Sequence, residues 1–146
     1  MKNLTASALI LAAALTGSVT TAFAQNTGSL KAEIPFNFRV GNQEFKAGTY
    51  ETSMIPNNTG IRALRIVNTD THVVRLIVAS IAAYPNSEAE RVADARLVFT
   101  CTGSNCALSQ LWPGYLQNGM AFLPSSATHS APTHLAVIRL QAPAAD

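Results

Sequence analysis

The chain has 146 residues, of which 48% are hydrophobic and only 12% are charged, and its formal net charge is +2. Ordinary soluble domains carry about 25% charged residues, so we expect a surface built largely from Ser, Thr, Asn and Gln. The lysines and arginines are scattered along the chain and form no basic stripe. A run of phosphates would meet no complementary charge, and nucleic-acid binding is therefore not expected.

The N-terminal segment has the parts of a secretory signal peptide. Residues 1–3 carry one positive charge, residues 4–19 are uncharged and rich in Ala, Leu and Ile, and Ala22-Phe23-Ala24 fits the small-x-small pattern that a signal peptidase cuts. The apolar stretch is shorter than the roughly 20 strongly apolar residues that span a membrane. We therefore predict a signal-peptide helix within residues 1–24, cleavage between Ala24 and Gln25, and a mature protein that is periplasmic or secreted.

Lipid anchoring and stable membrane insertion of the mature chain are not expected. A lipoprotein needs a cysteine at the cleavage point, and the cysteines here are Cys101 and Cys106. An outer-membrane barrel is disfavoured because the mature chain has few aromatic residues for two girdles and its strands are short. Residues 25–146, about 120 residues with a charge near +1, are enough for a single domain with one core.

Alternation of apolar and polar residues is the main structural signal in the mature chain. Residues 34–40 place Ile34, Phe36, Phe38 and Val40 on one face and polar residues on the other, which indicates a half-buried strand. Pro35 cannot donate a ladder hydrogen bond, so we place this strand at a sheet edge or expect an irregularity in it.

Further strands separated by turn residues follow along the chain. The stretch 73–82 is apolar on both of its faces, which favours a position at the centre of a sheet. A polar loop over residues 84–94 contains one possible helical turn at 88–91. The other expected strands cover residues 49–55, 61–67, 96–101, 106–112, 120–123 and 134–141. About eight short strands predict an all-β fold, either an antiparallel β-sandwich or a small barrel.

Cys101 and Cys106 flank a four-residue turn and should face one another across a hairpin. In an oxidising compartment this spacing predicts a disulfide. A redox-active pair is the alternative, but redox dithiols usually lie at a helix N-terminus that lowers the thiol pKa, and these two cysteines lie on expected strands.

No other group of residues has the types and spacing of a known catalytic or metal site. His129 and His134 are close in sequence but lack a nearby Cys or carboxylate to complete a metal site, and His72 stands alone beside a turn. Gly-x-Ser-x-Gly is absent, and the carboxylates Glu88, Glu90 and Asp94 share one polar loop. We therefore expect no bound metal, no cofactor and no catalytic residues.

Trp112-Pro113-Gly114-Tyr115 stands at the end of an expected strand. Aromatic rings displayed there can stack on sugar rings, which makes Trp112 and Tyr115 the candidates for a glycan-binding site. Large aromatics at such a place more often close one end of the core, and we favour that interpretation.

Six short motifs are spread over most of the mature chain: Ile34-Pro35-Phe36-Asn37-Phe38, Val40-Gly41-Asn42, Ala47-Gly48-Thr49-Tyr50, Leu97-Val98-Phe99, Leu108-Ser109-Gln110-Leu111-Trp112 and Leu123-Pro124-Ser125. In their order and spacing they resemble a family of small, signal-peptide-bearing exported proteins of soil bacteria to which no function is assigned. Lys46 stands where that family would have proline, and the Cys101 to Cys106 hairpin replaces a tyrosine-rich turn. The resemblance implies a β fold and export, and it supplies no catalytic residue, ligand or partner.

The leader, the alternation and the missing catalytic sets lead to one expectation. The protein is a non-catalytic exported β domain with a structural or interaction role in the cell envelope, and its partner is an envelope protein or a glycan. Two alternatives stay open: a glycan-binding module that uses exposed aromatics, and a hydrolase whose site is assembled only in the fold.

Overall fold

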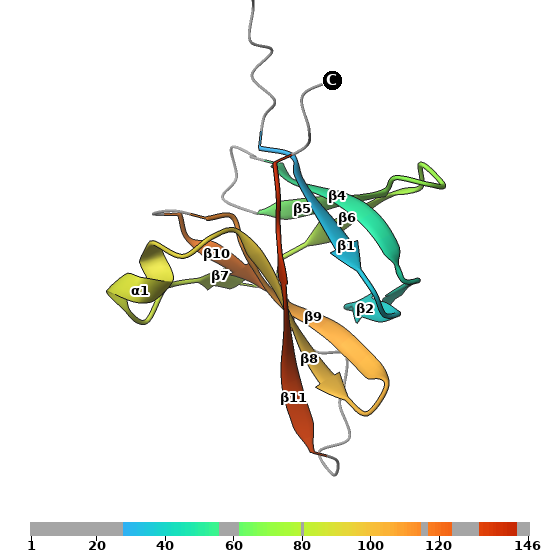
Figure 1. Ribbon diagram of the computed structural model, residues 1–146. Helices are drawn as coiled ribbons and strands as arrows, with labels where there is room; N and C mark the ends of the chain where they lie inside the picture. The colour runs from blue at the N-terminus through green and yellow to red at the C-terminus, as the bar shows by residue number, and fades with distance from the viewer. Residues whose placement is uncertain (1–27, 56–61, 80, 115–116, 124–131, 143–146) are drawn as a thin grey trace, which may run out of the picture.

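The computed structural model describes residues 28–55, 62–79, 81–114, 117–123 and 132–142, which form eleven strands and one short helix in two sheets (Figure 1). The predicted signal-peptide helix lies outside the described residues. The first sheet is antiparallel and has the strand order β1 (Leu30–Ile34), β4 (Gly48–Ile55), β5 (Ala63–Asn68) and β6 (Val74–Val78). The second has the order β11 (Thr133–Arg139), β8 (Arg96–Thr102), β9 (Asn105–Trp112), β10 (Gly119–Ala121) and β7 (Ile81–Ala83), with β2 (Phe38–Val40) and β3 (Gln43–Phe45) beside β9.

The two sheets form an all-β sandwich and do not close into a barrel, which decides between the two predicted architectures. β1 and β11 meet at one side, where the backbones of Lys31 and Gln141 exchange two hydrogen bonds of 2.7 and 2.9 Å. At the other side the chain passes directly from β6 in one sheet to β7 in the other. The antiparallel pairing is general, apart from β2, which runs parallel to β9.

The expected strand over residues 34–40 is divided between the sheets. β1 ends at Ile34 and pairs with β4, whereas β2 begins at Phe38 and pairs with β3 and β9. Pro35 stands directly after β1, where its missing N–H ends the ladder, so the predicted irregularity is confirmed. Buried and exposed residues still alternate on both sides of this break, because Ile34, Phe38 and Val40 are buried while Pro35 is exposed.

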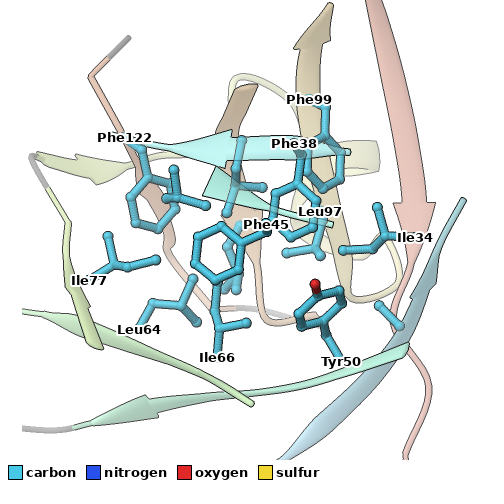
Figure 2. Packing of buried hydrophobic residues seen from close by; sticks show 14 of the residues in the cluster. Ile34, Phe38, Phe45, Tyr50, Leu64, Ile66, Ile77, Leu97, Phe99 and Phe122 are labelled. Carbon is cyan, nitrogen blue, oxygen red and sulfur yellow. The ribbon is translucent and has the colours of Figure 1, made fainter. Parts of the chain in front are cut away.

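Aromatic rings occupy the middle of the core (Figure 2). Phe38 stacks on Phe45 with ring centroids 4.9 Å apart, and its edge-to-face contacts with Tyr50 and Phe99 have centroid distances of 5.4 and 5.3 Å. Leu64 and Ile66 of β5 approach this cluster from the first sheet, as Figure 2 shows. The core is therefore made from the inward-facing residues of both sheets, as a sandwich requires.

The position of β6 also differs from the sequence-based prediction. The stretch 73–82 was expected as a single central strand, but it forms β6 and β7, which lie at the edges of different sheets. Of the five residues of β6, only Ile77 is buried. The prediction of a central position is wrong because apolar residues on both faces indicate burial only when other parts of the chain cover both faces.

Candidate functional site

Trp112 lies at the end of β9 on the outer face of the second sheet. Its neighbour Leu111 points into the core and pairs with Leu97, while Trp112 pairs with Arg96 and points the other way. The indole ring is nevertheless only 3% exposed. Its Nε1–H donates a hydrogen bond of 3.0 Å to Oε1 of Gln110, so its polar atom is satisfied within the protein.

Arg96, the first residue of β8, covers the Trp112 ring. The Arg96 guanidinium lies over the indole, with its carbon 5.1 Å from the ring centroid, and Arg96 Nη2 is 3.7 Å from Oε1 of Glu90. Glu90 belongs to α1 (Glu88–Arg91), whose N-cap Ser87 accepts a hydrogen bond from the Glu90 N–H, as predicted for a helical turn here. The Trp112 ring, the Arg96 guanidinium and the Glu90 carboxylate thus form a chain of contacts that holds α1 against the second sheet.

Gly119 on β10 allows the opposite side of the indole to be packed tightly. A Cβ atom at this position would lie 2.8 Å from the carbonyl oxygen of Leu111 and 2.9 Å from Cε3 of Trp112. Both distances are shorter than real Cβ contacts, so only glycine fits between β10 and the ring. Trp112 is thus held from both sides, and it offers no exposed face to a sugar.

The glycan hypothesis rested on Trp112 together with Tyr115. Tyr115 lies outside the described residues, and Trp112 is buried, which fits its interpretation as a residue that closes one end of the sheet. The sequence did not predict the contact with Arg96, because a regular hairpin with Cys101 opposite Cys106 would set Arg96 opposite Leu111. The bulge between Val98 and Phe99 shifts the register and brings Arg96 opposite Trp112.

Cys101 and Cys106 are joined by a disulfide, as predicted. They stand directly opposite one another in the β8–β9 register and expose only 1% and 8% of their surface. Both belong to the core cluster, and no thiol is displayed to a redox partner. The arrangement is that of a structural crosslink at the end of a hairpin.

Replacing both cysteines with alanine should lower the free energy of unfolding by about 2 kcal/mol, because the crosslink no longer restricts the unfolded chain. Urea melts of the oxidised protein and of the double variant measure the difference. Ser104→Ala, in the exposed turn of the same hairpin, should change it by less than about 0.5 kcal/mol. Thiol labelling of the denatured, unreduced protein should give no adduct, and two labelled cysteines would contradict the disulfide.

The histidines and carboxylates considered in the sequence form no common site among the described residues. His72 is exposed in the turn between β5 and β6 of the first sheet, and His134 is exposed on β11 of the second sheet. His129 lies outside the described residues. No group of three or more potential metal ligands occurs in the part of the chain that the structure describes. The Glu90 carboxylate pairs with Arg96 and accepts a hydrogen bond of 2.7 Å from the Asn86 N–H. The Glu88 carboxylate lies 3.6 Å from the Arg91 guanidinium. Both carboxylates therefore stabilise α1.

Among the residues that the structure describes, two concave regions stand out, and neither gathers reactive groups. One has a volume of about 250 Å³ and is lined mainly by apolar atoms of Leu30, Met54 and Leu111 between the sheets. The other, about 430 Å³, is lined by both polar and apolar side chains beside the disulfide hairpin, and Arg39 Nε lies there 3.9 Å from Glu44 Oε1. The first is smaller than most ligand pockets, and the second combines this exposed ion pair with the buried rings of Phe38 and Phe45.

The outer side of β6 exposes three alternate aliphatic side chains, one more than β11, the edge strand of the second sheet, where Leu135 and Val137 are exposed. Val74, Leu76 and Val78, which we call the β6 face, are 44%, 58% and 63% exposed. Ile81, at the start of β7, follows with 62%. Monomeric proteins rarely gather exposed aliphatic side chains on one edge strand, because such a strand is a template for pairing with another chain.

The backbone along this edge is also open to a further strand. The Asn68 N–H donates to the Val73 carbonyl at 3.1 Å, and the Ala79 N–H donates to the Arg62 carbonyl at 2.9 Å. Because such pairs alternate with non-bonded pairs in an antiparallel ladder, the odd-numbered residues of this segment turn their N–H and C=O groups to β5. The residues of the β6 face turn theirs away from the sheet.

Comparison with protein families, characterised proteins and solved structures finds no match to this chain. Within the described ranges there is no helix with the length and apolar character needed to cross a membrane.

Proposed function

We propose that this protein is a non-catalytic exported domain that acts by binding another polypeptide in the cell envelope through β6. The signal-peptide pattern and the buried disulfide support a location outside the cytoplasm. A β-sandwich with an open apolar edge strand can have a structural or interaction role, because that strand can pair with a strand of another protein.

One observation carries the proposal: a strand with the sequence of a central strand lies at an edge. Its exposed aliphatic side chains and the backbone groups that point away from β5 belong to the same three residues, Val74, Leu76 and Val78. Addition of a strand at such an edge gains main-chain hydrogen bonds for affinity and side-chain contacts for specificity. Neither the buried Trp112 nor the dispersed carboxylates favour another function to this degree.

Site-specific photocrosslinking in exporting cells tests the proposal. A photoreactive phenylalanine analogue at Leu76 should form adducts of increased mass in the envelope fraction, because a partner strand would lie within contact distance. The same analogue at Leu135 is the matched control, since Leu135 is 68% exposed on β11, an edge strand of the other sheet. Equal adducts at both positions, or none at Leu76, would contradict the proposed role of β6.

Export itself gives a separate expected result. Protein recovered outside the cytoplasm should have the intact mass of a chain that begins at Gln25, with two fewer hydrogens because Cys101 and Cys106 are bonded. Changing Ala22 and Ala24 to larger residues should block cleavage and leave the precursor in the membrane fraction. An extracellular or periplasmic species that retains Met1 would overturn the predicted leader.

A further inference from the structure

We infer that the polypeptide bound by β6 is a second copy of this chain, added antiparallel about a twofold axis through Leu76. The inference rests on the proposed function and names its partner. It would join the two four-stranded sheets into one continuous sheet across the two molecules.

The sequence of β6 is self-complementary in this arrangement. With Leu76 opposite Leu76 of the second copy, Val74 stands opposite Val78 and Arg75 opposite Ile77. The backbone N–H and C=O groups of Val74, Leu76 and Val78, which point away from β5, then face the same groups of the second copy. Hydrogen-bonded pairs can therefore form at each of these three positions. Aliphatic residues face one another along the outer side, where cross-strand pairs stabilise a sheet.

Charge selects this register over its neighbours. The alternative with Arg75 opposite Arg75 of the second copy also preserves the hydrogen-bond pattern, but it sets two like charges directly against each other. Sliding in the other direction pairs Ile77 with Ile77 and leaves Val74 beyond the end of the partner strand. Only the Leu76-centred register overlaps all five residues of β6 without opposing charges.

The β1 edge of the first sheet lacks the features that make β6 suitable. β1 carries Lys31 and Glu33 on its exposed side, ends before Pro35, and is bonded to Gln141 at its start. On β6 the corresponding protection is one contact, in which Arg75 Nη1 donates to the Val74 carbonyl at 3.2 Å. The N–H of Val78 from the second copy would replace that exposed guanidinium as the donor.

Electrostatics between whole molecules do not oppose this association. The formal charge of the mature chain is only about +1, so two copies repel each other weakly at physiological salt. The contact of two five-residue strands is smaller than a standard protein interface. We therefore expect a dimer that dissociates on dilution, and one that the high local concentration in an envelope compartment would favour.

A charge exchange at the twofold axis tests the inference. Sedimentation equilibrium of the mature protein should show a mass that rises with concentration toward that of two chains. Leu76→Lys and Leu76→Glu should each remain monomeric, because each would place two like charges in direct opposition, whereas their mixture should form a heterodimer. Leu135→Lys is the matched control and should dimerise as the wild type does. Thermal melts should show that all three variants stay folded, since both side chains are exposed.

Cysteine substitutions test the register. Under mild oxidation Leu76→Cys should form a crosslinked dimer several-fold faster than Val78→Cys, because only position 76 faces itself. A mixture of Val74→Cys and Val78→Cys should give the mixed dimer. Mass spectrometry under denaturing conditions must show the native Cys101–Cys106 bond intact in each product.

The outcomes separate this inference from the proposed function. A wild-type protein that stays monomeric at the highest concentration, a Leu76→Lys variant that still dimerises, or dimerisation lost only in Leu135→Lys would each overturn the self-pairing. If the photoadducts at Leu76 have a mass other than that of two chains, the proposed function stands and the second copy is excluded as the partner. Adducts with the mass of two chains support both.

Discussion

Replacing Phe38 with alanine is expected to lower the free energy of unfolding by about 3–5 kcal/mol, a large share of the stability of a small domain. Phe38 is 2% exposed and contacts the rings of Phe45, Tyr50 and Phe99. Alanine would leave a cavity among these rings, which are held by strands of both sheets and can collapse only in part. Urea melts followed by tyrosine fluorescence measure the loss.

Arg39→Ala is the matched control, one residue along the same strand. Its side chain is 46% exposed and its contact with Glu44 is long, at 3.9 Å, so the substitution should cost less than about 0.5 kcal/mol. Asn37 is not an equivalent control, because its Oδ1 accepts a hydrogen bond from the Ala47 N–H at 2.9 Å. Similar losses for Phe38→Ala and Arg39→Ala would mean that β2 does not have one buried and one exposed face.

Local sequence patterns predicted most of the individual strands. The β8–β9 hairpin, its disulfide and the helical turn at α1 each depend on residues that lie close together in the chain. The turn between β5 and β6 is similar, since Oδ1 of Asn68 accepts hydrogen bonds from the N–H groups of Asp70 and Thr71. Information of this kind is contained in a short window of sequence.

The assignment of strands to sheets could not be read in the same way. The alternation through residues 34–40 is continuous, yet the chain changes sheets at Pro35, because side-chain alternation reports burial and not the identity of the hydrogen-bonding neighbour. β3 was not predicted, since the segment Gln43–Phe45 has one buried residue and is stabilised by its pairing with β2. Non-local pairing decides both features.

The candidate site lies where the predicted central strand failed. Apolar residues on both faces of residues 73–82 indicated a strand with neighbours on each side, and the structure supplies a neighbour on one side only. Local preference and observed position disagree mainly where a protein carries function or strain. The disagreement at β6 is therefore the physical reason to look for a partner strand there.

The last expected result concerns Trp112, whose replacement by alanine should lower the free energy of unfolding by about 3–5 kcal/mol. The indole is 3% exposed, lies under the Arg96 guanidinium and contacts β10 at Gly119. Its loss would leave a cavity between β9 and β10 and would free Arg96 from the position that holds Glu90. The melts used for Phe38→Ala measure the effect, and amide exchange should show α1 opening before the rest of the sandwich.

Trp112→Phe is the informative companion variant. It keeps an apolar ring but removes the N–H that donates to Gln110, so the expected cost is about 1 kcal/mol. A sugar-stacking tryptophan would behave in the opposite way, since an exposed ring can be removed with little loss of stability and with loss of glycan binding. A stable Trp112→Ala protein that no longer binds a glycan array recognised by the wild type would therefore overturn the structural role of Trp112. Large destabilisation by Trp112→Ala would confirm that the indole holds β9, β10 and α1 together.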